Sequence, residues 1–189
     1  MQVSPEEVHL WPVRQPPRAT ATHPQWRWIL NLQERALTTT PRPRLAVLID
    51  AENACAAHAD ALMARVAHFG KPIIRRAYGD WTTPQRMPWK KILGALAIRP
   101  QQQFRYVRNK NTSDSALIMD AMELVHARSV EGVCIVSSDS DFIGLASRIQ
   151  EAGLLVYGFG MRPVVDAFVA ACDEFVFLDE VSAAAAGSG

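Results

Sequence analysis

The sequence predicts an α/β fold in which a mainly parallel sheet lies between two layers of helices, a three-layer sandwich. Short apolar runs alternate along the chain with segments whose apolar residues recur at helical spacing. Runs such as GVCIVS are apolar at nearly every position, which is typical of strands buried on both faces. The chain of 189 residues, 49% of them hydrophobic, is long enough to bury one core.

Local patterns define the first two strands and helices. Residues 45–50 (LAVLID) are predicted to form a buried strand, and residues 54–69 a helix that ends at Gly70. A second strand is expected at residues 71–78. Residues 88–98 carry apolar side chains on one helical face, which predicts a second helix.

The middle of the chain continues the alternation. Residues 104–107 are predicted to form a short strand and residues 113–128 a long helix. The run GVCIVS at residues 132–137 predicts another buried strand, which is followed by a helix at residues 141–152.

The last elements and the two ends complete the layout. Residues 154–159 (LLVYGF) predict a strand, residues 163–171 a helix and residues 175–178 a final strand. Residues 1–43 are rich in proline and lack sustained periodicity, so we expect a flexible N-terminal extension outside the core. Residues 181–189, which end in AAAAGSG, are expected to form a low-complexity tail.

Composition argues against a membrane or secreted protein. No run approaches the roughly 20 apolar residues that a membrane span needs, and the N-terminus lacks the layout of a signal peptide. The three cysteines, Cys55, Cys134 and Cys172, lie among small apolar residues, which indicates packed free thiols in a reducing compartment. We therefore expect a cytoplasmic protein.

The net charge of +1 conceals two oppositely charged segments. Residues 71–110 contain ten basic residues and one acid, whereas residues 111–189 contain three basic and twelve acidic residues. A basic segment beside an acidic one suits an anionic polymer that is held against a cation bound by carboxylates. Charges that only solvate ordinary surfaces are the alternative explanation.

Acidic residues follow the predicted strands at the edge where parallel α/β sheets bind ligands. Asp50 ends the first strand, and Asn53 follows three positions later. Asp139 and Asp141 come directly after GVCIVS. Asp114 continues the apolar stripe of its helix at i, i+3 and i+4 spacing, so we expect it to point toward the end of the sheet.

Carboxylates that converge in this way repel one another unless a cation compensates them. Oxygen ligands without histidine or cysteine favour Mg²⁺ or Mn²⁺, and such ions support phosphodiester hydrolysis. We expect Asp50, Asp114, Asp139 and Asp141 to be catalytic metal ligands, and Asn53 to supply a neutral oxygen or to orient a ligand. Each residue taken alone also fits a turn or a helix cap. Their joint placement favours the metal site.

These motifs resemble a known family. LIDAEN, NKNTSDSALIMDAMEL, VSSDSDFIGLASRIQEAG and VYGFG are similar to the NYN domain, a branch of the PIN-like nucleases, in the bacterial LabA-like group. GDWTTPQ, WKK and QQQF also fit that group. The resemblance runs over residues 44–180 and implies a PIN-like sandwich with Mg²⁺- or Mn²⁺-dependent ribonuclease activity. It implies acidic roles for Asp50, Asp114, Asp139 and Asp141, with Asn53 beside Asp50.

The chain departs from the family pattern at a few positions. Asp120 matches a family acid but lies about 120° around the helix from the Asp114 stripe, so we expect it to be structural. Ser138 stands where many relatives have glycine, and Met161 to Pro163 replace a more polar segment. Many relatives also carry a C-terminal winged-helix module of the LOTUS type, which we expect to be absent here.

Single-stranded RNA is the expected partner, since basic segments with interleaved aromatic residues suit its phosphates and bases. We expect Arg108 and Lys110, just before Asp114, to contact phosphate, and Trp81 to stack on a base. Trp89 fits the apolar face of its helix and is expected in the core.

Other functions remain open at this stage. The domain could be a non-catalytic RNA-binding or regulatory NYN domain, and the first 43 residues could serve protein interaction. A phosphohydrolase or a primase-like (Toprim) site also has DxD after a strand, but a Toprim site pairs it with an earlier Glu where this chain has Asp50. A homodimer is also left open.

Overall fold

The computed structural model describes residues 42–104 and 112–181. In these residues the elements follow in the order β1 (Arg44–Asp50), the 3-10 turn η1 (Ala56–His58), α2 (Ala59–Phe69), β2 (Lys71–Gly79), η2 (Pro84–Arg86), α3 (Met87–Ile92), β3 (Arg99–Gln102), α4 (Thr112–His126), β4 (Gly132–Val136), η3 (Ser140–Phe142), α5 (Ile143–Glu151), β5 (Leu155–Gly160), α6 (Asp166–Ala170) and β6 (Glu174–Phe177). The predictions for residues 1–41 and 182–189 fall outside this part of the chain.

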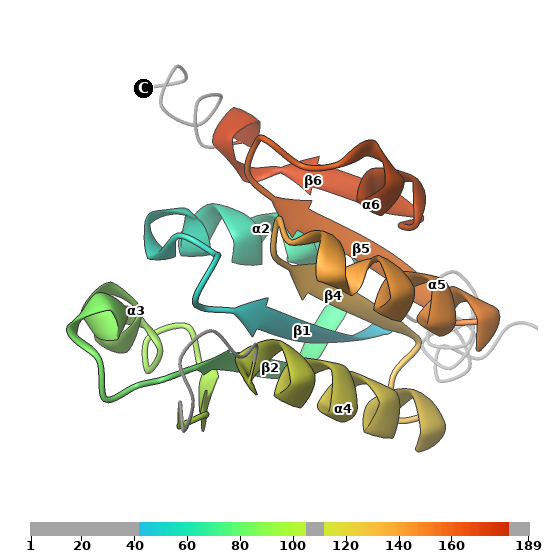
Figure 1. The fold of residues 1–189 in the computed structure, drawn as a ribbon. Helices are drawn as coiled ribbons and strands as arrows, with labels where there is room; N and C mark the ends of the chain where they lie inside the picture. The colour runs from blue at the N-terminus through green and yellow to red at the C-terminus, as the bar shows by residue number, and fades with distance from the viewer. Residues whose placement is uncertain (1–41, 105–111, 182–189) are drawn as a thin grey trace, which may run out of the picture. The chain divides into compact units, whose positions relative to one another are not determined.

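The sheet has the strand order β3-β2-β1-β4-β5-β6, and every neighbouring pair is parallel (Figure 1). The chain therefore builds outward from β1 in one direction and then outward from β4 in the other. Ligands of such sheets bind beyond the carboxyl ends of the strands where the direction of winding reverses. Here that point lies between β1 and β4.

Helices cover both faces of the sheet, which confirms the predicted three-layer α/β fold. In β1, Val47 and Ile49 belong to the core shared with α2 and α3. Ala46 and Leu48 belong to the core shared with α4, α5 and α6. Figure 1 shows α4 and α5 on one side of the sheet and α2 on the other. Because side chains alternate along a strand, Asp50 lies on the same face of the sheet as Ala46 and Leu48, the face covered by α4.

The strand predicted at residues 104–107 falls mostly outside the described residues. The described residues contain the strand β3, whose polar sequence RPQQ precedes that segment, and Phe104 lies outside it. Residues 105–107 lie outside the described part. β3 pairs with β2 alone and forms the edge of the sheet, where backbone hydrogen bonds suffice and Pro100 is tolerated. Because β3 is polar, hydrophobic patterning does not locate it.

The second predicted helix is shorter than its pattern suggested. α3 ends at Ile92, and turns follow in which Ala97 has a φ of 51°. Arg75 of β2 donates to the carbonyl oxygen of Leu96 at 2.9 Å, which fixes this turn against the sheet. Leu93, Leu96 and Ile98 therefore reach the core from the irregular segment after α3 and not from a helix.

Two further expectations can be compared with the structure. Across the described ranges, every helix is too short or too polar to cross a membrane. All three cysteines are free, but only Cys134 and Cys172 are buried, and Cys55 is exposed. The prediction that Cys55 is packed was wrong, because the chain between β1 and α2 follows the surface.

Candidate metal centre

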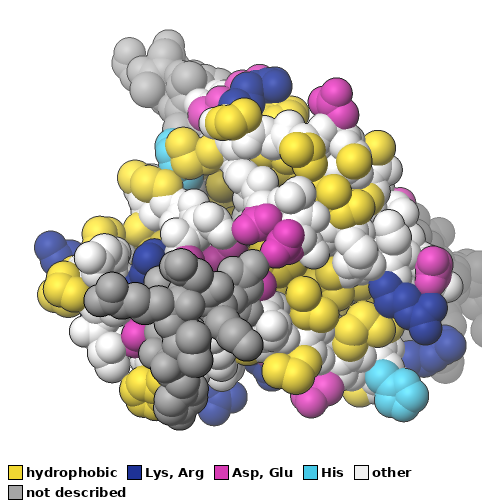
Figure 2. Space-filling view, in the orientation of Figure 1, with side chains coloured by type: hydrophobic (Ala, Val, Ile, Leu, Met, Phe, Trp, Pro, Cys, Tyr) yellow, Lys and Arg dark blue, Asp and Glu magenta, His cyan; other side chains and the backbone are white. Residues whose placement is uncertain are grey.

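Three aspartates meet beyond the carboxyl ends of β1 and β4. One carboxylate oxygen from each of Asp114, Asp139 and Asp141 lies within 4.8 Å of those from the other two. Asp114 is in the first turn of α4, and the other two lie in the turn that follows β4. Figure 2, which has the orientation of Figure 1, shows acidic side chains gathered near the middle of the visible surface. The structure thus brings three of the four predicted ligands together.

The turn after β4 has a local cause. Asp139 is the N-cap of η3, and its side chain accepts a hydrogen bond from the backbone N–H of Asp141 at 3.0 Å. Aspartate is favoured at this position because its short side chain satisfies a free N–H at the start of a helical turn. The capping interaction that sequence alone offered as an alternative therefore occurs, and it places both carboxylates beside Asp114.

Asp50 lies next to this cluster but is not one of its three members. Only 1% of Asp50 is exposed, and its carboxylate accepts hydrogen bonds from Asn53 Nδ2 at 2.6 Å and Ser137 Oγ at 2.9 Å. The backbone N–H groups of Glu52 and Asn53 donate to its other oxygen at 3.1 and 3.4 Å. Asn53 therefore orients Asp50 with its amide nitrogen, and the structure holds Asp50 by protein donors.

Ser137 is a site residue that the sequence analysis missed. Its buried hydroxyl donates to Asp50 and accepts from the backbone N–H of Asp139 at 3.1 Å. One side chain thus connects the end of β1 to the turn after β4. The available signal was its position as the first polar residue after the apolar run GVCIV.

The electrostatics of the cluster favour a cation. Burial, the largest cause, and the negative charges of Asp50 and Asp139 together raise the pKa of Asp114 to about 6. Glu52, which the sequence analysis did not single out, and Asp141 contribute in the same direction. Burial also raises the pKa of Asp50, while its four hydrogen bonds act against that shift. The donors are all carboxylate oxygens, the set that hard divalent cations prefer.

Ser138 and Met161, two positions at which the chain departs from the family pattern, contact each other. The hydroxyl of Ser138 donates to the carbonyl oxygen of Met161 and accepts from its N–H, both at 2.8 Å. Between the two loops, a Cβ added to Gly160 would lie 2.9 Å from the carbonyl oxygen of Ser137. Glycine is therefore required for this close approach, and the contact fixes the loop after β5 beside the acidic turn.

The prediction that Trp81 stacks on a base was wrong for this structure. Only 9% of Trp81 is exposed, and its indole N–H donates to the carbonyl oxygen of Gln101 at 2.9 Å. Its backbone N–H donates to the side chain of Gln102 at 3.0 Å, and that side chain donates to Asp80 at 3.0 Å. The motifs GDWTTPQ and QQQF are thus bonded to each other, and Trp81 has a packing role.

The segment after Trp81 supports the loop that carries Asp50. Arg86 donates to the carbonyl oxygen of Ala51. The indole of Trp89, which is 2% exposed as its predicted core role requires, donates to the carbonyl oxygen of Ala54 at 3.0 Å. Two backbone carbonyls on either side of Asn53 are therefore held by α3 and the turn before it.

The remaining predicted residues divide into two groups. Arg108 and Lys110 lie outside the described residues, so their contact with RNA stays a prediction. Asp120 faces away from the acidic cluster and accepts from the guanidinium of Arg76 and the hydroxyl of Tyr78. These two partners are consistent with the structural role expected for Asp120.

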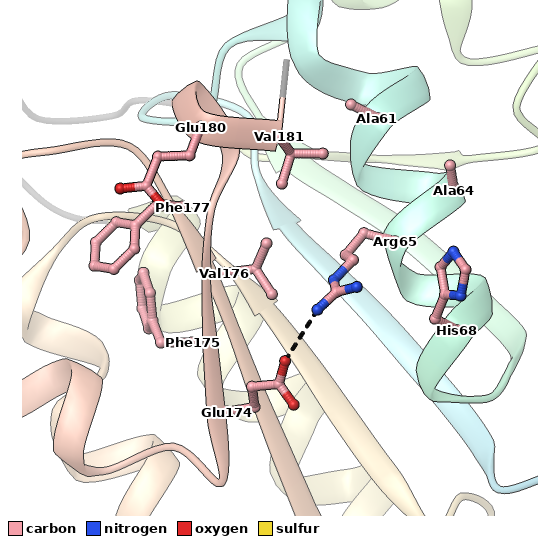
Figure 3. Close-up of a pocket in the computed structure, with 10 residues that line it drawn as sticks. All are labelled: Ala61, Ala64, Arg65, His68, Glu174, Phe175, Val176, Phe177, Glu180 and Val181. Carbon is pink, nitrogen blue, oxygen red and sulfur yellow. Dashed lines mark hydrogen bonds and ion pairs between the residues drawn. The ribbon is translucent and has the colours of Figure 1, made fainter. Parts of the chain in front are cut away.

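A cavity of about 500 Å³ between α2 and β6 lies apart from the acids (Figure 3). The ion pair between Arg65 and Glu174, at 3.2 Å, crosses it in the figure. None of the four predicted metal ligands lines this cavity. It is therefore not part of the candidate metal centre.

Comparisons with known proteins agree with the fold and the motifs. A crystal structure of a protein of unknown function from Vibrio parahaemolyticus RIMD 2210633 matches with a TM-score of 0.61 and 22% identity, covering 76% of this chain and 98% of that one. No curated protein matches the chain. The family model of the NYN domain matches residues 44–179, whereas placement in the LabA-like group stays a prediction. The match spans all six strands and the acidic centre, and the chain belongs to the NYN domain family.

Proposed function

We propose that this chain is a ribonuclease of the PIN-like class that hydrolyses phosphodiester bonds of RNA with Mg²⁺ or Mn²⁺. The observation that carries the proposal is the meeting of Asp114, Asp139 and Asp141 within 4.8 Å at the point where the winding of the sheet reverses. Membership of the NYN domain family supports it, because these motifs resemble those of PIN-like nucleases.

The three aspartates would hold the cation, which supplies a Lewis acid for the phosphodiester and lowers the pKa of a water molecule. Asp50 adds a negative charge from the β1 side, and its charge already acts on Asp114. Asn53 and Ser137 keep the Asp50 carboxylate in one orientation. Hydrogen bonds within the protein thus orient the carboxylates of Asp50 and Asp139 beside the proposed cation site, which favours binding by a preorganised set of charges.

Cleavage of RNA with and without divalent cations tests the proposal. We expect the full chain to cleave single-stranded RNA in Mn²⁺ or Mg²⁺ and to lose activity in EDTA. Asp141→Asn should lower the rate on the order of 10²–10³-fold, since it removes one ligand of a charge-stabilising group. Asp60→Asn is the matched control, because Asp60 is an exposed acid on α2 that is not a member of the acidic cluster.

Two outcomes would contradict this mechanism. Activity that survives both EDTA and Asp141→Asn excludes a carboxylate-bound cation. Binding of RNA without cleavage in either metal would favour a non-catalytic, RNA-binding or regulatory role instead.

The segment before α4 is expected to bind the phosphates. Arg108 and Lys110 precede Asp114 by six and four residues in the sequence. Changing both to glutamate should weaken binding of single-stranded RNA and reduce the salt slope by about 0.7 for each phosphate contact that is lost. Filter binding at several salt concentrations measures this slope. The double variant Lys90→Glu with Lys91→Glu, at exposed positions of α3, is the control, and unchanged affinity at low salt would remove Arg108 and Lys110 from the site.

A further inference from the structure

A groove of about 650 Å³ runs between α4 and the β2–β3 edge of the sheet. Tyr78 of β2, which lines it, pairs in register with Asp50. Ala116 of α4, which also lines it, follows Asp114 by two residues. Because both walls begin beside residues of the acidic site, the groove leads away from the metal centre on the same face of the sheet.

One wall of the groove carries polar side chains that the fold does not use. The side chains of Arg99, Gln101 and Gln103 have no hydrogen-bond partner in residues 42–104 or 112–181. Gln102 points to the other face, where its amide bonds Asp80 and Trp81. Residues at i and i+2 of an extended segment share a face, so two free amides and one guanidinium lie along the same wall.

The floor of the groove is fixed and its rim is apolar. Arg76 and Asp120 form an ion pair with each other, and the hydroxyl of Tyr78 donates to the same carboxylate. Met119, on the α4 wall, is 62% exposed, and Pro100 of β3 also lines the groove from an exposed position. Exposed apolar surface beside unpaired amides matches a flat ligand that stacks and also forms hydrogen bonds at its edge.

We infer that this groove is a subsite for a nucleobase of single-stranded RNA close to the scissile phosphate, an inference that rests on the proposed ribonuclease function. Gln101 and Gln103 form hydrogen bonds to the edge of the base, for which an amide offers both donors and an acceptor. Arg99, exposed on the edge strand, contacts the phosphate of the same nucleotide. The groove thereby sets a base preference at one position relative to the cut.

Steady-state cleavage of short RNA oligonucleotides tests the subsite with the full chain in Mn²⁺. The oligonucleotides differ by a single base at each position around the cut, and kcat and KM are measured separately. We expect the wild type to prefer one base at one position by about tenfold. The double variant Gln101→Leu with Gln103→Leu should abolish this preference and raise KM for the preferred oligonucleotide, with kcat changed less than twofold. Arg99→Gln should raise KM for all oligonucleotides alike.

Matched controls distinguish a loss of base recognition in the groove from a general loss of structure. Gln150→Leu, at an exposed position of α5, and Lys71→Ala, at the amino end of β2, should leave KM and the base preference unchanged. Thermal unfolding verifies that each variant is folded. If the double variant is not folded, the KM of the exposed Arg99→Gln variant decides whether the groove contacts RNA. Cleavage with unchanged KM and base preference in the variants overturns the subsite alone. A wild type that cleaves no RNA in either metal overturns the proposed function and the subsite with it.

Discussion

Replacing Asp114 with asparagine should stabilise the metal-free protein at neutral pH and at the same time strongly lower the rate of RNA cleavage. The folded protein raises the pKa of this carboxyl from 3.8 to about 6, so the folded state binds the proton more tightly than the unfolded state. The stability that this proton supplies is present below about pH 4 and is lost as the pH rises toward 6 and above. At pH 7 the charged carboxylate therefore costs about 1–3 kcal/mol, which asparagine removes.

Divalent cations should reverse the difference in stability between the wild type and Asp114→Asn. A bound cation compensates the charge of Asp114, so Mn²⁺ should raise the melting temperature of the wild type at pH 7 and have a much smaller effect on Asp114→Asn. The cleavage rate should fall on the order of 10²–10³-fold for the reason given for the other ligands. Thermal unfolding between pH 4.5 and 7.5, in EDTA and in Mn²⁺, measures the stability, and Asp60→Asn serves as the control. Equal Mn²⁺-induced shifts in wild type and Asp114→Asn would show that Asp114 is not a ligand.

Asp120→Ala should have the opposite effect to Asp114→Asn: we expect a large loss of stability, with the metal centre retained. Its carboxylate is 17% exposed and accepts from both Arg76 and Tyr78, so its removal leaves a half-buried guanidinium and a buried hydroxyl without their partner. We expect the free energy of unfolding to fall by ~2–3 kcal/mol. Urea denaturation measures this loss. The melting temperature should still rise with Mn²⁺.

Two other variants calibrate the result for Asp120. Tyr78→Phe removes one of the two hydrogen bonds and should cost about 1 kcal/mol. Met119→Ala, next to Asp120 on α4 but 62% exposed, should change stability by less than about 0.5 kcal/mol. A folded Asp120→Ala variant that no longer responds to Mn²⁺ would mean that this acid also holds the cation.

The sequence was sufficient to locate the acidic centre because its logic is topological. A parallel sheet brings the carboxyl ends of its strands to one edge, and Asp50 and Asp139 approach each other there because β1 and β4 are neighbours in the sheet. The helical phase of Asp114 then predicted its direction, and the structure confirms its meeting with Asp139 and Asp141. What the sequence did not supply was the division of roles at Asp50. That depends on the hydroxyl of Ser137, which reaches across from a neighbouring strand 87 residues away.

The errors at the other edge of the sheet share a physical cause. β3 is polar because an edge strand needs no apolar neighbours on both sides, so hydrophobic patterning could not find it. Trp81 sits in a polar sequence, GDWTTPQ, yet it is buried because Gln101 and Gln102 accept its two N–H donors. Both cases depend on partners about 20 residues away, which a local pattern does not contain. The basic segment 71–110 needs a similar revision, since Arg75, Arg76 and Arg86 bond to protein groups.

The reversal of winding between β1 and β4 has a consequence for how the protein matures. Asp50 belongs to the half of the domain that is made first, Asp139 and Asp141 belong to the half made last, and Asp114 lies on the crossover between them. A nascent chain that has completed only β1, β2 and β3 contains no assembled cluster. All three members of the acidic cluster follow β3 in the sequence, so the cluster can form only after β4 and the turn behind it have been made. If the proposed function holds, we expect a chain that ends before β4 to cleave no RNA, because it lacks Asp139 and Asp141.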